Sequence, residues 1–204
     1  HEYNDGVTMY DEIINKVYEN NIYKCKSDIR TDNEQKYINI YKRDTDYTKK
    51  HLPQEMSIIM HIMDTINSSS ADPDKIVILD IGGGNGIIAY FLSELFGFTI
   101  IVIDQYTPKH AIDFKKTVKF FRLEKNIEDT KIKDINSIDH FDKDITDCDV
   151  FIIGKHLCGA GTDHAIKWSI EKKLPVYGFV IATCCFHKSL YEEYVYKEYL
   201  DSIN

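Results

Sequence analysis

The sequence predicts an α/β fold built on a mostly parallel, doubly wound sheet. Residues 76–81 (IVILDI) form a short, β-branched, apolar run, which is typical of a strand buried on both faces. The glycine-rich segment 82–86 follows, and apolar residues then recur at helical spacing until Gly97, where a glycine can end a helix. Strand, glycine turn and helix in this order are the nucleotide-binding start of such a sheet.

The spacing of the glycines indicates which ligand this turn binds. A dinucleotide fingerprint read from Gly82 and Gly84 needs another glycine at position 87, which is Ile87. The pattern Asp80-x-Gly82-x-Gly84-x-Gly86 instead resembles the acidic glycine motif of class I S-adenosylmethionine-dependent methyltransferases, which have a Rossmann-like fold. On this interpretation, Asp80 and the three glycines bind S-adenosylmethionine and its product S-adenosylhomocysteine. A structural glycine turn without a ligand is the alternative.

Composition and charge restrict the possible partners. The chain has 204 residues and a net charge of −8, and this acidic balance argues against a broad basic surface for nucleic acid. No run approaches the roughly 18 apolar residues of a membrane span, so no membrane association is predicted. The five cysteines lack a disulfide-framework spacing. We therefore expect no disulfide-linked partner and an intracellular location, in the cytoplasm or nucleus. Nothing in the pattern indicates the oligomeric state.

Residues 1–70 are predicted to form a helical extension packed on the core. Apolar residues at helical spacing indicate helices over 8–24 and 53–66, and the polar, tyrosine-rich segment between them is expected to be irregular. Residues 71–204 are predicted to form the Rossmann-like domain. We expect this domain to be incomplete at its C-terminus, because fewer strands are readable than methyltransferases of this class usually have.

Four further strands are predicted after the glycine turn, and ligands in open α/β sheets bind at the carboxyl ends of such strands. Asp104 ends the second strand, where an acidic side chain can accept hydrogen bonds from both hydroxyls of a ribose; a helix N-cap is the alternative. Asp134 could approach the adenine of the cofactor or cap a turn. The predicted strands are 98–104, 131–135, 149–154 and 177–182, with helices over 110–123 and about 162–173.

Polar stretches with cysteine and histidine follow the last two predicted strands. An unactivated hydroxyl is a poor nucleophile, so methyl transfer to oxygen favours a nearby base. Lys155 is the first candidate, His156 the second and Asp163 the third. Phosphate binding by Lys155 and a packing role for His156 are open alternatives. Zinc takes cysteine and histidine ligands, but no Cys-x-x-Cys or His-x-x-x-His spacing supports such a site, so no metal is predicted.

A more specific resemblance covers most of the chain. KHLCGAGTD (155–163) and IATCC (181–185) resemble signatures of the eukaryotic tRNA 2′-O-methyltransferases that modify nucleotide 4 of the acceptor stem, and KHLPQEMSI (50–58) is similar to that family's segment before the first strand. The resemblance implies methyl transfer from S-adenosylmethionine to a ribose 2′-hydroxyl of tRNA. The sequence departs from the family pattern at Phe186 and Ser189, which replace a histidine and a cysteine after the double cysteine.

Two groups of basic residues could bind the tRNA. A duplex of A-form RNA is recognised through its shape and its 2′-hydroxyls rather than its base edges. Such basic runs are more often solvated faces. Two other functions stay open: a methyltransferase acting on protein or small molecules, which the acidic charge would suit, and a catalytically silent cofactor-binding scaffold in RNA processing. The candidate RNA-binding residues are Lys50, His51, Lys115, Lys116, Lys119 and Arg122.

Overall fold

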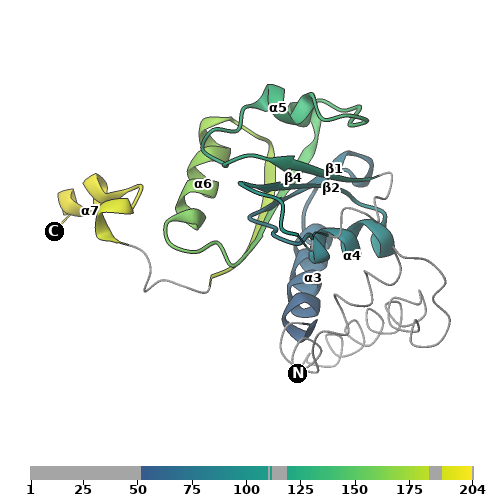
Figure 1. Cartoon of the computed structure of the whole chain (residues 1–204), viewed down its shortest axis with the longest axis horizontal. Coiled ribbons are helices and arrows are strands. Elements are labelled where there is room, and N and C mark those ends of the chain that lie inside the picture. The colour runs from purple at the N-terminus through teal and green to yellow at the C-terminus, as the bar shows by residue number, and fades with distance from the viewer. Residues whose placement is uncertain (1–51, 110, 112–118, 184–189, 204) are drawn as a thin grey trace.

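The computed structural model describes residues 52–109, 111, 119–183 and 190–203. Its centre is a five-stranded sheet with the order β3-β2-β1-β4-β5, in which every neighbouring pair is parallel (Figure 1). This arrangement confirms the predicted α/β fold class. The strands are β1 Ile76–Ile81, β2 Thr99–Asp104, β3 Phe120–Glu124, β4 Asp149–Lys155 and β5 Val176–Ala182.

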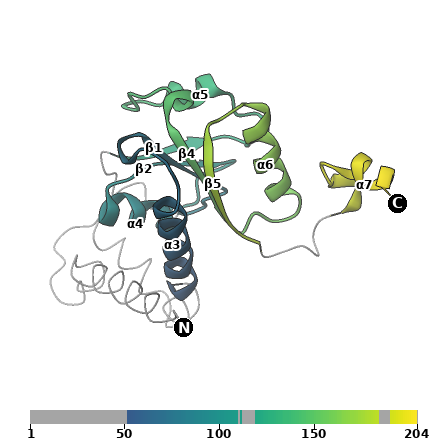
Figure 2. The same ribbon diagram turned by 180° about the vertical axis from the view of Figure 1, so that it is seen from behind.

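Helices cover both faces of the sheet and divide its core into two layers. Helices α3 (Leu52–Asn67) and α4 (Ile87–Phe96) pack on one face, where Ile59 and Phe91 are fully buried. Helices α5 (Ile132–Asn136) and α6 (Gly161–Glu171) pack on the other, around Trp168. The short helix α7 (Lys197–Ile203) lies apart from the sheet, beyond the β5 side of the molecule (Figure 2).

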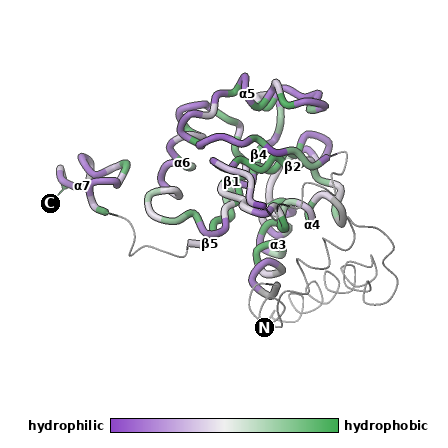
Figure 3. The backbone as a smooth tube through the Cα atoms, viewed as in Figure 1, coloured by the Kyte–Doolittle hydropathy of each residue, from purple (hydrophilic) through white to green (hydrophobic). Residues whose placement is uncertain are grey.

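The position of β1 follows from its sequence. All six of its residues are buried, because it lies between β2 and β4 and is covered by helices on both faces. The hydropathy colouring shows apolar stretches along the inner strands and polar ones on the loops around α5 (Figure 3). The chain leaves β1 toward β2 on one side and later returns to β4 on the other, which makes the ends of β1 and β4 a topological switch point.

Most of the predicted elements match the structure. The helix expected over 53–66 is α3, and the strands expected over 98–104, 149–154 and 177–182 are β2, β4 and β5. The predicted helix 8–24 and the irregular segment after it lie outside the described residues. Within the described ranges, no helix combines the length and the apolar character that a membrane crossing requires.

The helix predicted over 110–123 is wrong for its last part, which is strand β3. Residues 110 and 112–118 lie outside the described part of the chain, and β3 follows them in parallel pairing with β2. Phe120 packs into the layer of α4, whereas Phe121 packs into the opposite layer, where its ring lies edge-on to Phe141. This alternation between the two faces is the period of a strand.

The strand predicted over 131–135 is wrong as well, because this segment forms the short helix α5. The backbone amide of Lys131 donates a hydrogen bond of 2.8 Å to the Asp134 carboxylate, as in a capping box at the start of a helix. Ile132 and Ile135 both pack into the layer beneath α5. Their separation of three residues puts them on one helix face. Asp134 caps the start of this helix, as in the second of the two roles considered for it.

Candidate functional site

A pocket of about 480 Å³ opens at the carboxyl ends of β1, β2 and β3. Its floor is the glycine loop after β1, and its walls are the segments that follow the other strands and the first turns of α6. This is the edge at which open α/β sheets bind their ligands. The lining residues are Ile81, Gly82 and Gly84 from the loop, 103–106 and Pro108 after β2, 125–128 after β3, and 156–158, Gly161 and His164 from β4 and α6.

The glycine loop takes a conformation that other residues rarely adopt. Gly82, Gly84 and Gly86 have φ angles of 65°, 52° and 77°, in the left-handed region. The Asp104 carboxylate at the end of β2 accepts a hydrogen bond of 2.9 Å from the Gly84 amide. At Gly84 an added Cβ would meet no atom within 4 Å, so the loop leaves open space on its pocket side. Asp104 thus ties the glycine loop to the neighbouring strand beside the pocket.

A single leucine joins the glycine loop to the segment after β4. A Cβ at Gly82 would lie 2.8 Å from Leu157 Cδ2, and a Cβ at Gly154 would lie 2.5 Å from Leu157 Cδ1. A Cβ at either position would therefore require the leucine side chain to shift. His156, immediately before it, has a φ of 65°, which is a strained conformation for a residue with a Cβ. The turn after β4 is consequently held close over the glycine loop, and it places His156 in the pocket wall.

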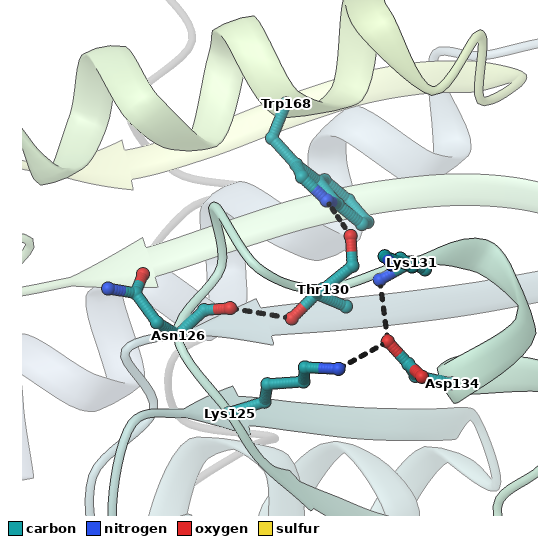
Figure 4. Close-up of polar contacts among 6 residues, drawn as sticks. All are labelled: Lys125, Asn126, Thr130, Lys131, Asp134 and Trp168. Carbon is teal, nitrogen blue, oxygen red and sulfur yellow. Dashed lines mark hydrogen bonds and ion pairs between the residues drawn. The ribbon is translucent and has the colours of Figure 1, made fainter.

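The wall formed by 125–128 is held by a network of hydrogen bonds (Figure 4). Lys125 Nζ lies 2.6 Å from the Asp134 carboxylate, so the two side chains form an ion pair behind the wall. The Thr130 hydroxyl donates to the Asn126 carbonyl at 2.8 Å, and Trp168 Nε1 donates to the Thr130 carbonyl at 2.8 Å. The loop after β3 is thereby fixed to α5 on one side and to α6 on the other.

Replacing Trp168 with phenylalanine should loosen this wall. The indole is 3% exposed, and the substitution leaves the buried Thr130 carbonyl without its donor. An unsatisfied buried acceptor costs about 1–3 kcal/mol, so we expect the free energy of unfolding to fall by about 2 kcal/mol in urea denaturation. Ile170→Ala on the same helix is the control, because this side chain is 62% exposed and should change stability by less than about 0.5 kcal/mol. Equal stability of wild type and Trp168→Phe would contradict the role of this hydrogen bond.

A second polar contact crosses the pocket wall. His164 Nδ1 on α6 lies 2.9 Å from the Glu128 carboxylate on the loop after β3, and both residues line the pocket. The contact joins the wall after β3 to the wall formed by α6. It also orients the imidazole through one ring nitrogen, as carboxylates commonly do for functional histidines.

Lys155 points away from the pocket and toward α3. Its Nζ lies 3.0 Å from Glu55 Oε1, and the two side chains are only 12% and 7% exposed. Side chains alternate along a strand, so Lys155 shares the sheet face of Ile153 and Phe151, which pack on α3 and α4. Neither Lys155 nor Asp163 lines the pocket, whereas His156 does.

Asp80 is buried beneath the glycine loop, on the same sheet face as Lys155. It is 2% exposed, and a Cβ at Gly83 would lie 2.5 Å from its Oδ2. Burial raises the pKa of the carboxyl group from 3.8 to about 7. The positive charges of Arg122 and Lys155 oppose this rise, and the negative charges of Asp104 and Glu55 add to it.

The structure therefore separates the predicted cofactor residues into groups. Gly82, Gly84 and Asp104 line the pocket, Asp80 lies beneath its floor, and Gly86 begins α4. Asp134 does not line the pocket, because its carboxylate is bound to Lys125 and to the Lys131 amide.

The RNA-binding prediction is wrong for Arg122. Its terminal guanidinium nitrogens are buried, and a Cβ at Gly86 would lie 3.0 Å from Nη2, so the side chain reaches under the glycine loop. The physical reason is that Arg122 belongs to β3 and shares the inward face of Phe120. Lys119 is exposed, and its Nζ donates to the Gly97 carbonyl at 2.7 Å. The remaining candidates, Lys50, His51, Lys115 and Lys116, lie outside the described residues.

Sequence reasoning identified Asp104 and His156 but missed the other wall residues, 125–128 and His164. The segment 125–128 was not recognised as following a strand, because the third strand was predicted over 131–135. Once β3 is located at Phe120–Glu124, the rule that ligands bind after strand ends identifies this segment directly. Nothing local marks His164 as a pocket residue, since it lies in the first turn of an otherwise ordinary helix.

The described residues fit S-adenosylmethionine. The open space above Gly84 admits a ligand against the backbone, and Asp104 supplies a carboxylate with further acceptor capacity for ribose hydroxyls. A volume of about 480 Å³ is within the range of small-molecule sites. In the part of the chain that the structure describes, no three His, Cys, Asp or Glu side chains gather as they would around a metal ion.

Comparisons with known proteins identify two curated relatives and a similar solved structure. The tRNA:m(4)X modification enzyme TRM13 of Debaryomyces hansenii is 35% identical over 103 residues, which are 45% of this chain and 22% of that protein. The TRM13 homolog of Homo sapiens is 25% identical over 206 residues, which are 78% of this chain and 41% of that protein. This chain thus spans less than half the length of these relatives. Among solved structures, the plantazolicin methyltransferase BpumL with S-adenosylhomocysteine matches with a TM-score of 0.40 and 16% identity, over 87% of this chain and 61% of that one.

The family comparison covers both sides of the pocket. The model of the family described as methyltransferase TRM13 matches residues 53–204, which include α3, the glycine loop and all five strands of the described sheet. Because this match extends over most of the chain, the protein belongs to the TRM13 methyltransferase family.

Proposed function

We propose that this chain transfers a methyl group from S-adenosylmethionine to a ribose 2′-hydroxyl in the acceptor stem of tRNA. The observation that carries the proposal is the Asp104 carboxylate, which holds the Gly84 amide at 2.9 Å beside the pocket in a chain of the TRM13 family. Relatives named as tRNA modification enzymes support the substrate. The 2′-oxygen as acceptor rests on the resemblance of the segments after β4 and β5. A tRNA substrate would place the activity in the cytoplasm or nucleus.

Different residues of the pocket would bind different parts of the cofactor. The bound cofactor supplies an activated methyl group on a sulfonium. Asp104 would accept hydrogen bonds from the ribose hydroxyls, and the glycine loop would let the ligand approach the backbone. The segment 125–128, fixed by its hydrogen bonds to α5 and α6, would form the wall against which the base of the adenosine packs.

The geometry favours His156 over Lys155 as the base. His156 lines the pocket, and an imidazole titrates in the range that proton transfer at neutral pH requires. Lys155 is held by Glu55 on the α3 side of the sheet, so we assign it an electrostatic role behind the glycine loop. Asp163 does not line the pocket and receives no role in the transfer.

Transfer of labelled methyl groups to RNA tests the proposal. The chain would be incubated with methyl-tritiated S-adenosylmethionine and unmodified total tRNA, and the RNA would then be digested with alkali. A 2′-O-methyl group blocks cleavage of the adjacent phosphodiester, so the label should appear in an alkali-resistant dinucleotide. His156→Ala should reduce the rate by about 100-fold, as expected for loss of a general base. Lys167→Met, on the exposed side of α6, is the matched control and should leave the rate unchanged.

Each other outcome contradicts a stated part of the proposal. Label in alkali-sensitive nucleotides would show that the methyl group is transferred to a base and not to the 2′-oxygen. Label in protein or small molecules but not in RNA would favour the alternative substrates. Cofactor binding without transfer to any acceptor would favour a silent scaffold. An unchanged rate in His156→Ala would remove the base role from this residue and leave the reaction itself intact.

A further inference from the structure

Four charged side chains surround Asp80 in the buried layer behind the glycine loop. They are Glu55 from α3, Asp104 from β2, Arg122 from β3 and Lys155 from β4, and each acts on the Asp80 carboxyl group through its charge. Glu55 and Lys155 are in direct contact at 3.0 Å, and Arg122 reaches under the loop at Gly86. The five groups thus form one cluster that joins four strands, β1 to β4, to α3.

The charges of this cluster balance only when Asp80 is neutral. The carboxylates of Glu55 and Asp104 then compensate the cations of Arg122 and Lys155. Ionisation of Asp80 adds an uncompensated negative charge at a position that is 2% exposed. Water cannot screen a charge at such a position effectively, so the nearest ligand in the pocket has a strong influence on it.

We propose that Asp80 is a proton switch that distinguishes the methyl donor from the demethylated product by charge. This inference rests on the proposed function, because it takes S-adenosylmethionine as the ligand of the pocket. Below pH 7, Asp80 is mostly protonated in the ligand-free and product-bound protein and is ionised when the sulfonium is bound. Binding of the donor therefore releases a proton to the solvent, whereas binding of the product does not.

The chemistry of the two ligands supplies the discrimination. S-adenosylmethionine carries one more positive charge than S-adenosylhomocysteine, and this charge restores the balance of the cluster with Asp80 ionised. Asp80 lies beneath Gly83 and does not line the pocket, so it acts through its field and not by contact. After transfer the sulfur is neutral, and Asp80 recovers the proton it gave up. The one proton released per turnover is then the proton lost by the acceptor hydroxyl.

The raised pKa of Asp80, about 7, puts the switch in the physiological range. About nine-tenths of the carboxyl groups are protonated at pH 6 and about half at pH 7. If only the ionised form binds the donor tightly, affinity for S-adenosylmethionine rises roughly fivefold between these pH values, and affinity for S-adenosylhomocysteine does not. Above pH 7 the amino group of the ligand titrates too, so the test stays below it.

Two histidines, His156 and His164, also line the pocket. Their contribution must be separated from that of Asp80, because a protonated imidazole would also disfavour a cationic ligand. Asp80→Asn removes the ionisation beneath the loop, keeps the size of the side chain and leaves both histidines in place. The difference between wild type and Asp80→Asn is therefore the part that belongs to Asp80.

Calorimetric titration in buffers with different ionisation enthalpies counts the protons released on binding. Wild-type protein at pH 6.5 would be titrated with S-adenosylmethionine, S-adenosylhomocysteine and sinefungin, an analogue with an ammonium in place of the sulfonium. We expect release of about 0.5 proton or more for the two cationic ligands in excess of that for S-adenosylhomocysteine. In Asp80→Asn this excess should disappear. A fold check of the variant by thermal unfolding accompanies the titration.

Stability of the ligand-free protein provides a second readout that needs no ligand. Because folding raises the pKa of Asp80 above 3.8, the native state holds this proton more firmly than the unfolded chain. The contribution of Asp80 to stability is therefore fully present below the unfolded-state pKa of 3.8 and is lost as the pH rises through about 7. The melting temperature should fall more between pH 5.5 and 7.5 in wild type than in Asp80→Asn.

The outcomes separate this inference from the proposed function. Binding of all three ligands with equal proton release would overturn the switch and leave the cofactor assignment standing. An excess that persists in Asp80→Asn would move the switch to another group, such as a pocket histidine. Failure of every ligand to bind would overturn both the proposed function and the inference. Parallel melting curves in wild type and Asp80→Asn would show that Asp80 does not titrate in this range.

Discussion

Substituting Asp104 with alanine is expected to weaken the binding of S-adenosylhomocysteine by about 100-fold or more. The carboxylate accepts hydrogen bonds from the amides of Gly84 at 2.9 Å and Tyr106 at 3.4 Å, and it would also accept the ribose hydroxyls. Hydrogen bonds to a charged group contribute about 1.5–3 kcal/mol each, so the loss of two corresponds to at least two orders of magnitude in affinity. Calorimetric titration of the purified chain measures this directly.

Two matched variants test whether a loss of affinity in Asp104→Ala comes from the missing carboxylate. Asp104→Asn keeps one carbonyl acceptor and should retain part of the affinity. Asp129→Ala removes an exposed acid from the turn behind the pocket wall, outside the pocket lining, and should bind as wild type does. If Asp104→Ala binds the ligand within about threefold of wild type while it remains folded, Asp104 does not hold the ribose, and the assignment of the pocket is wrong.

Breaking the buried pair between Glu55 and Lys155 should produce the largest loss of stability. The two side chains are 7% and 12% exposed, and removal of one partner leaves the other charge in the same buried layer. Such single removals cost about 3–5 kcal/mol, so we expect both Glu55→Gln and Lys155→Met to lower the free energy of unfolding by about 3 kcal/mol. Replacing both partners, as Glu55→Gln with Lys155→Met, should cost much less than the sum of the single changes.

Urea denaturation of the single and double variants tests this coupling. The exposed pair of Lys167 and Glu171 is the control, because its atoms are 3.8 Å apart and its side chains are 48% and 57% exposed. We expect Glu171→Gln to change stability by less than about 0.5 kcal/mol. Strictly additive losses at Glu55 and Lys155 would show that the two residues do not stabilise each other, and would remove the link between α3 and the end of β4.

The inner part of the sheet was predictable because its strands are buried on both faces. β1 and β4 show unbroken apolar runs of strand length, and the glycines that follow β1 are needed at positive φ. At the outer strand β3 the same reasoning failed. That strand is only five residues long, and only its first residue, Phe120, is buried, so it lacks the fully buried apolar run of the inner strands.

Less of the site could be predicted, because long-range contacts decide which side chains meet. Lys155 follows a strand at the ligand edge, yet its direction is set by Glu55, 100 residues earlier in the chain. No local pattern distinguishes Glu55 from a solvated acid in the first turn of α3. Arg122 looked like part of a basic surface and is instead turned under the glycine loop by the pleat of β3. Asp104 was predictable, since its position depends only on the ends of two adjacent parallel strands.

Photolabelling with the methyl donor tests the central claim that this pocket is the cofactor site. Wild-type chain would be irradiated with methyl-tritiated S-adenosylmethionine, digested with trypsin, and the labelled peptides sequenced. We predict label in one or more of the peptides 76–109, 126–131 and 156–167, which carry most of the pocket lining, and its suppression by excess S-adenosylhomocysteine. Label confined to other peptides, such as 134–143, or label that the product does not suppress, would contradict the account.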